Sequence, residues 1–228
     1  MIRALLALTL LFPAINIDLS KERVGKEPAK FLSVVGNWSI ATDEQGRKVV
    51  QVDGRQWIKG QPSAGLAAKA RTIYGSRHEE FIDSVQAYAY FPIAVAKDVS
   101  EFRDGEISMR FRIMSGQLDQ CAGILFNVKP NGDYLAIRFN GKEDNLVLWK
   151  FVTGKRSFVK KGAHDVKLKL GEWHRMRVVT AGKSVRGYLD DELLIEYDWT
   201  EAIDGKIGLW SKTDSVSQFA DYVVTPAK

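Results

Sequence analysis

Residues 106–113, EISMRFRI, place an apolar residue at nearly every second position. This spacing is typical of a β-strand with one face in a protein core, because side chains alternate across a strand. The alternation returns in residues 166–170, VKLKL, and less regularly from Arg175 to Val179. Residues 124–128 and 146–152 are almost continuously apolar, which indicates strands that are covered on both faces or that line a cleft.

Turn signals rich in glycine and asparagine separate these segments. They lie at residues 129–133 (KPNGD), 140–142 (NGK), 153–155 (TGK) and 181–183 (AGK). Gly and Asn accept the positive φ angles that hairpin turns require. Many short strands at such intervals indicate a sandwich or barrel, and the strand–helix alternation of parallel α/β proteins does not occur. We therefore predict an all-β fold, a two-sheet antiparallel jelly-roll sandwich.

One region breaks this rhythm. Residues 63–84, SAGLAAKARTIYGSRHEEFIDS, are rich in Ala, Lys, Arg and Glu. We predict a short helical excursion there, which either carries function on a long loop or covers a sheet edge.

The N-terminus predicts export. Arg3 precedes an apolar run from Ala4 to Ile15, which is the order of a secretory signal and is too short for a permanent membrane anchor. We therefore assign residues 1–20 to a signal peptide and residues 21–228 to one domain, with a periplasmic or extracellular location. The alternative is that the run is a buried first strand. The rest of the sequence contains no apolar stretch long enough to span a membrane.

Charge and cysteine content exclude some classes of function. The net charge is +5, and the basic residues are spread along the 228-residue chain rather than gathered in a patch, so we expect no nucleic acid partner. Cys121 is the single cysteine, so no intramolecular disulfide can form. It lies in an apolar run and is predicted to be a small buried residue. The oligomeric state cannot be derived from these features.

A series of short motifs follows in a fixed order: GNW (36–38), FRDGEIS (102–108), DQCAGILF (119–126), YLAIRFN (134–140), EDNL (143–146), GKR (154–156), GEWH (171–174), GLWSK (208–212), DSV (214–216) and FAD (219–221). In this order they resemble exported bacterial domains with a concanavalin A-like jelly roll, relatives of laminin G domains and of the 3-keto-disaccharide hydrolase domain family. The resemblance covers about four-fifths of the chain and implies carbohydrate as the partner. It departs from the family at residues 188–192, a turn without glycine, and at Ala220, where many relatives have an acid. A calcium site formed by that acid pair in a relative is therefore in doubt here.

The richest polar cluster surrounds residues 134–140. The even-numbered residues of this strand share one side, and we assign the odd-numbered residues to the core. Fixed donors and acceptors suit sugar hydroxyls, and an aromatic ring suits the apolar face of a sugar. The candidate ligand-binding residues are Tyr134, Arg138, Asn140, Glu143, Asn145, Trp149, Lys150, Trp210 and Lys212. Two alternatives stay open: an Arg–Glu pair that merely pins a hairpin, and a Trp210 that fills the core.

No catalytic residue can be assigned. The E-x-D-x-x-E spacing that family 16 glycoside hydrolases, which share the predicted fold, carry on one strand is absent, and Asp190-Asp191-Glu192 lies in a turn. His78 with Glu79-Glu80 could form an acid–base site, but a solvated helix face is the favoured interpretation of these residues. His164 and His174 lack the spacing of a zinc site, so we expect no protein-bound metal; no cofactor is firmly indicated, and calcium is left open.

Three functions therefore follow from the sequence. The first is a carbohydrate-binding domain that uses a concave sheet face. The second, implied by the resemblance, is a 3-keto-glycoside hydrolase or lyase. The third is a structural or protein-contact domain of the laminin G kind.

Overall fold

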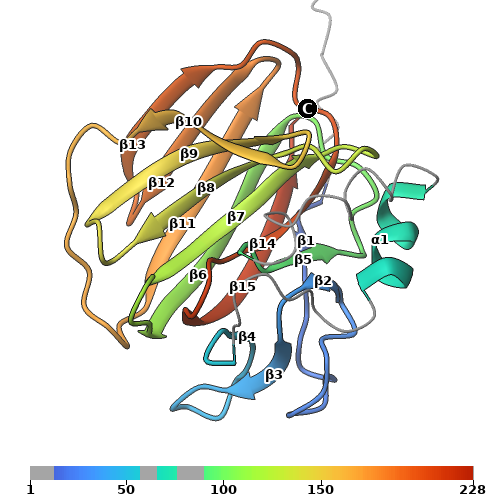
Figure 1. Cartoon of the computed structure of the whole chain (residues 1–228), viewed down its shortest axis with the longest axis vertical. Helices are drawn as coiled ribbons and strands as arrows, with labels where there is room; N and C mark the ends of the chain where they lie inside the picture. The colour runs from blue at the N-terminus through green and yellow to red at the C-terminus, as the bar shows by residue number, and fades with distance from the viewer. Residues whose placement is uncertain (1–12, 57–65, 76–89, 228) are drawn as a thin grey trace, which may run out of the picture.

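The alternating segment 106–113 lies within strand β6 (Gly105–Ser115), which occupies a central position in one of two antiparallel sheets (Figure 1). The computed structural model describes residues 13–56, 66–75 and 90–227. The two sheets pack face to face as a jelly-roll sandwich, as the alternation and the hairpin turns predicted.

The larger sheet, sheet A, has eight strands. Its order is β13 (Glu192–Asp198), β12 (Ser184–Leu189), β11 (His174–Ala181), β6, β15 (Val216–Pro226), β4 (Lys48–Asp53) and β3 (Trp38–Thr42), with β1 (Ile15–Asn16) also paired to β15. The seven-stranded sheet, sheet B, has the order β10 (Lys155–Lys161), β9 (Asn145–Val152), β8 (Tyr134–Asn140), β7 (Cys121–Val128), β14 (Lys206–Trp210), β5 (Ile93–Ala96) and β2 (Phe31–Val35). Strands distant in sequence are neighbours in both sheets, so the chain crosses repeatedly between them.

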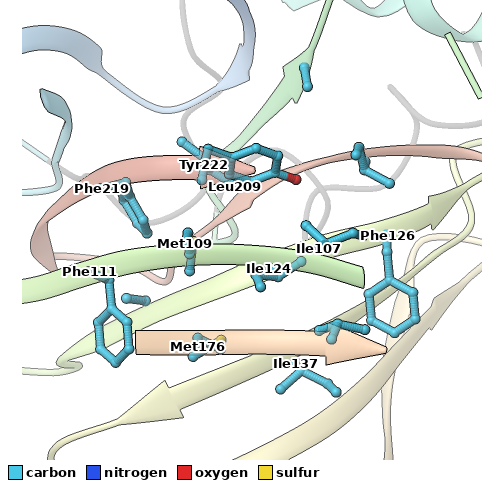
Figure 2. Close-up of a cluster of buried hydrophobic side chains, with 14 of the residues drawn as sticks. Ile107, Met109, Phe111, Ile124, Phe126, Ile137, Met176, Leu209, Phe219 and Tyr222 are labelled. Atoms are coloured by element: carbon cyan, nitrogen blue, oxygen red, sulfur yellow. The ribbon is translucent and has the colours of Figure 1, made fainter. Parts of the chain in front are cut away.

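The main core lies between the sheets (Figure 2). Ile107, Met109 and Phe111 come from the alternating face of β6, and all three are almost fully buried. Phe111 meets Phe139 of β8 with ring centroids 6.4 Å apart. The odd-numbered residues of β8 therefore face the core, as predicted.

A second apolar cluster covers part of the outer face of sheet B. Helix α1 (Leu66–Tyr74) packs against β2 through Ala70 and Tyr74, which are 0% and 2% exposed. Phe91 stacks on Trp210, with ring centroids 5.6 Å apart. The predicted helical excursion is thus present at α1 and covers a sheet face; residues 63–65 and 76–84 of the predicted segment lie outside the described residues.

The prediction of a strand at residues 166–170 is wrong. This segment connects β10 in sheet B to β11 in sheet A and pairs with neither sheet as a strand. Val166 and Leu168 pack against the rim of the core, while Lys167 between them is exposed. An extended linker that packs one side against the core shows the same alternation of apolar and polar residues as a strand. The pattern alone therefore could not distinguish the two.

Residues 15–17 belong to the sandwich. β1 pairs with β15, and Ile17 is 4% exposed in the main core, with its N–H donated to the carbonyl of Tyr222. A boundary at residue 20 would therefore remove part of the folded domain, whereas a boundary at Ala14 would leave it intact. Processing itself stays a prediction. None of the described helices is long and apolar enough to cross a membrane.

Aspartates take the place of glycine in the turn between β12 and β13. Asp190 and Asp191 adopt φ angles of 47° and 67°, which short polar side chains tolerate better than most. Asp190 also accepts the backbone N–H of Arg175 at 2.8 Å and contacts His174 Nδ1 at 2.7 Å. His174 is thus held by a hydrogen bond at this turn.

Candidate functional site

The outer face of sheet B carries polar and aromatic side chains where β8, β9 and β10 lie side by side. Ala136, Trp149 and Phe158 form one cross-strand row, and Arg138 lies one row away on β8. We call the set Arg138, Glu143, Asn145, Trp149, Arg156 and Phe158 the arginine face.

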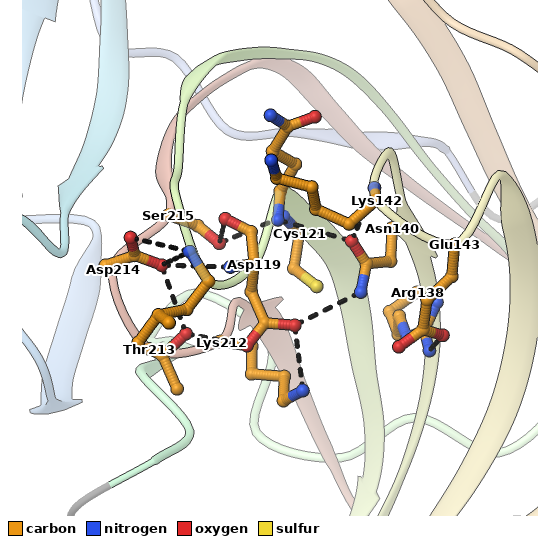
Figure 3. A network of polar contacts seen from close by, with 12 residues as sticks. Asp119, Cys121, Arg138, Asn140, Lys142, Glu143, Lys212, Thr213, Asp214 and Ser215 are labelled. Carbon is orange, nitrogen blue, oxygen red and sulfur yellow. Dashed lines mark hydrogen bonds and ion pairs between the residues drawn. The ribbon is translucent and has the colours of Figure 1, made fainter. Parts of the chain in front are cut away.

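Arg138 is fixed at the centre of the arginine face. Its Nη1 donates to Asn145 Oδ1 at 2.6 Å, and its Nη2 donates to Glu143 Oε2 at 2.6 Å (Figure 3). Arg138 is 1% exposed, whereas the Glu143 side chain is 45% exposed. These two hydrogen bonds hold the planar guanidinium in one orientation across the hairpin between β8 and β9.

Glu143 stays ionised under ordinary conditions. Burial alone would raise its pKa, but the charge and hydrogen bond of Arg138, with help from Lys212 and Asn145, lower it overall. The carboxylate is therefore an acceptor and a counter-ion for Arg138.

Gly123 makes room for this arrangement. It lies on β7 directly opposite Arg138, and a Cβ at this position would come within 2.8 Å of the Ile137 carbonyl oxygen and 2.9 Å of Arg138 Cβ. The absence of a side chain on β7 lets Arg138 occupy this part of the sheet surface.

An aromatic strip lies beside Arg138. Trp149 is half-buried and meets Phe158 edge to face at 5.9 Å, and Phe158 is 59% exposed. The Arg156 guanidinium lies 4.1 Å from the centre of the Trp149 ring and 5.1 Å from that of Phe91. Arg138 approaches Trp149 from β8, at 5.7 Å. Trp149 therefore lies between two guanidinium groups.

A second polar network adjoins the arginine face at the end of β8 (Figure 3). Asp119, which is 5% exposed, accepts Lys212 Nζ at 2.8 Å and Asn140 Nδ2 at 3.1 Å through Oδ1. Its Oδ2 accepts the Thr213 hydroxyl at 2.7 Å. Asn140 is fully buried, so it and Asp119 position Lys212 from beneath the surface.

Asp214 holds the loop that carries Asp119. Its carboxylate accepts the backbone N–H groups of Gln117 at 2.7 Å, Leu118 at 3.0 Å and Asp119 at 3.0 Å. Burial alone would raise the pKa of Asp214, but these backbone donors lower it overall. The loop between β6 and β7 is thereby tied to the segment after β14.

Tyr134 and Trp210 lie beneath the surface. They are 4% and 1% exposed, Trp210 Nε1 donates to Tyr134 Oη at 3.3 Å, and Tyr134 stacks on Phe151 at 4.8 Å. Phe91 covers Trp210, so this tryptophan fills the second apolar cluster and supports the sheet face from within. Of the two alternatives for Trp210, the structure shows the buried one.

Lys150 does not join the other candidates. It pairs across the sheet with Leu135, a core-facing residue of β8, and so lies on the opposite face from Trp149. Neighbouring residues of a strand point to opposite faces, so placing Trp149 and Lys150 together on one face was wrong.

Three residues of these clusters were missed in the sequence. Arg156 and Phe158 lie two apart on β10, on the same side as Trp149, and their alternation in KRSF was the available signal. Asp119 meets Lys212 from 93 positions away, and no local pattern links the two.

Few of the described residues are suited to general acid–base catalysis. Every carboxyl among them whose pKa departs clearly from its ordinary value has a lowered pKa, which suits ion pairing rather than proton donation. Cys121 is fully buried as predicted, and burial raises the pKa of its thiol to about 12. Within residues 13–56, 66–75 and 90–227, no group of three or more His, Cys, Asp or Glu is arranged to hold a metal ion. His78, Glu79 and Glu80 lie outside these ranges.

Comparison with known proteins identifies the fold. No family model matches the chain, and no curated protein matches it in sequence. Among solved structures, a carbohydrate-binding module, CBM66, from Bacillus subtilis is 15% identical, with a TM-score of 0.59 over 86% of this chain and 96% of that chain. A candidate glycosyl hydrolase from Parabacteroides distasonis is 13% identical, with a TM-score of 0.52 over 90% of this chain and 91% of that chain. A Bacillus subtilis protein of unknown function with a galectin-like fold is 12% identical, with a TM-score of 0.51 over 84% of this chain and 87% of that chain. The chain therefore has the concanavalin A-like β-sandwich fold, and at these identities the similarity shows the fold alone.

Proposed function

We propose that this concanavalin A-like sandwich binds a glycan on the arginine face. The observation that carries the proposal is the combination of a rigid polar anchor and an accessible aromatic strip. Arg138, locked by Glu143 and Asn145, lies beside the half-buried Trp149 and the exposed Phe158.

This combination matches what a sugar ring offers. Hydroxyl groups exchange hydrogen bonds with fixed donors and acceptors, and the C–H face of the ring packs on an aromatic side chain. The exposed position of Phe158 on the edge strand β10 leaves its ring accessible to such a sugar face. The module from Bacillus subtilis, which shares the fold, is described as carbohydrate-binding, and this supports the proposal.

Binding rather than cleavage accounts best for the described carboxylates. Glu143 and Asp119 are both held by cationic partners, at 2.6 Å and 2.8 Å. For Glu143 the adjacent charge of Arg138 lowers the pKa and favours ionisation, so this carboxylate is a poor proton donor.

We also propose that the protein is exported. The apolar run after Arg3 supports this location, and a glycan outside the cell would then be within reach.

A glycan array with purified protein tests the binding function. We expect selective binding to a set of oligosaccharides, weakened about ten-fold or more by Phe158→Ala, since a stacked ring contributes on the order of 1–2 kcal/mol. Leu193→Ala is the matched control, because Leu193 is an exposed apolar residue on β13 of the other sheet. Absence of binding to any glycan would refute the proposal and favour a protein-contact domain.

A further inference from the structure

Three N–H donors on the arginine face lack an acceptor. Arg138 Nε, Trp149 Nε1 and Arg156 Nη1 are each shielded from solvent, and none has a hydrogen-bond partner among the described residues. A shielded donor without an acceptor costs about 1–3 kcal/mol, so each one calls for an explanation, as do Arg110 Nη2, Trp173 Nε1 and Arg177 Nε at sheet A. Here the three residues touch one another, with Trp149 between the two arginines.

Charge is also unbalanced at this place. Arg138 is paired with Glu143, but no carboxylate among the described residues forms an ion pair with Arg156. Burial, and then the positive charge of Arg138, lower the pKa of Arg156. The positive charges of Arg138 and Arg156 thus lie on either side of Trp149, and among the described residues only Glu143, which pairs with Arg138, neutralises either of them.

The outer face of sheet A provides an internal comparison. Arg110 and Arg112 of β6 and Arg186 of β12 are each paired with an acid, which is Asp221, Glu44 and Glu196 respectively. Arg177 is paired with Glu106 at 2.8 Å. Each of these four arginines of sheet A has a neutralising acid, whereas Arg156 has none among the described residues.

We infer that the glycan bound on the arginine face is acidic and that Arg156 holds its anionic group. This inference rests on the proposed function and specifies its ligand class. A carboxylate or sulfate oxygen placed beside the partly exposed Arg156 would neutralise the excess charge, and the planar guanidinium suits either oxyanion. The aromatic strip of Trp149 and Phe158 would hold the sugar ring, with Arg138 on its other side.

Matched oligosaccharides separate this inference from the proposed function. Isothermal titration calorimetry would compare mannotriose, cellotriose and galactotriose with their C6-carboxylate and 6-O-sulfate counterparts. We expect at least one acidic member to bind about ten-fold or more tightly than its neutral match, with a preference that shrinks in 0.5 M NaCl as screening increases. Carboxylate or sulfate preference identifies the source of the oxyanion.

Arg156→Gln should abolish this preference, so that the acidic and neutral members bind the variant with similar affinity. Arg186→Gln, which removes an exposed, acid-paired arginine from sheet A, should leave both affinities unchanged. Arg156→Lys retains charge and serves if the glutamine variant fails to fold; we expect it to keep part of the preference. Equal binding of neutral and acidic members would overturn the inference and leave the proposed function standing. If no member of any pair binds, both the inference and the proposed function are overturned. If the preference for acidic members survives Arg156→Gln, the assignment of Arg156 is overturned.

Discussion

Asp214 offers a test of how the polar network is held, because its effect depends on pH in a defined direction. Asp214→Asn keeps the size of the side chain and removes the charge that accepts three backbone N–H groups. A hydrogen bond to a charged acceptor contributes about 1 kcal/mol more than one to a neutral acceptor. Three such bonds at a half-exposed site, discounted for solvent, lead us to expect a loss of about 2 kcal/mol at pH 7.

The loss should be visible in both thermal and urea unfolding. For a domain of this size, a loss of about 2 kcal/mol corresponds to a drop in Tm of about 4–8 °C. Asp98→Asn is the control: Asp98 forms an exposed pair with Lys30 at 2.8 Å, and such pairs contribute about 0–1 kcal/mol.

The pH dependence gives the refuting result. The pKa of Asp214 is lower in the folded protein than the unfolded value of about 3.9, so its contribution is fully present above that pH and is lost as the pH falls through the folded pKa. The difference in unfolding free energy between wild type and Asp214→Asn should therefore shrink below about pH 4. A difference that stays constant from pH 7 to pH 3, or one below about 0.5 kcal/mol at pH 7, would refute the reasoning.

Three further predictions concern packing. Gly123→Ala should lower the unfolding free energy by about 1–3 kcal/mol and weaken glycan binding, because its methyl group would collide with Arg138 Cβ. Gly162→Ala is the control, because a Cβ there has its nearest contact at 3.3 Å, and it should lower the unfolding free energy less in urea unfolding. Equal losses for the two variants would contradict the account. Ile17→Ala should cost about 2–4 kcal/mol in the same assay, and an unchanged midpoint would show that Ile17 is not part of the core. Cys121 should react with a thiol-specific reagent at pH 8 only after unfolding, since burial raises its pKa to about 12; rapid reaction in the native protein would contradict that burial.

The fold could be predicted from the sequence because its strands alternate strongly. The assignment of β8 residues to two faces needed only the period of two. Gly132, Gly154 and Gly182 adopt the positive φ angles that turns require, whereas aspartates take these angles after β8 and β12. The prediction of a strand at residues 166–170 was wrong because alternation indicates only that one side of a segment is packed. A linker along the rim of the core shares this feature with a strand. Strand pairing, rather than the pattern, separates the two.

The candidate site was predicted only in part, for physical reasons. Arg138, Glu143 and Asn145 meet across one hairpin, so local spacing brought them together. Asp119 and Lys212 meet through sheet topology, which no local pattern contains. The burial of Trp210 depends on Phe91 and the second apolar cluster, whose covering helix could not be placed from composition.

The most direct test of the central claim is a titration followed through the indole N–H signals in two-dimensional NMR. Trp149 and Trp173 each have a shielded indole N–H without an acceptor among the described residues, but Trp173 lies against Arg110 and Arg112 of sheet A. Trp149→Phe and Trp173→Phe assign the two signals, and the titrant is the oligosaccharide that binds most tightly in the calorimetric panel. Binding on the arginine face predicts a saturable shift of the Trp149 signal with Trp173 unmoved. A shift of Trp173 alone, or saturation of binding with Trp149 unmoved, would contradict it.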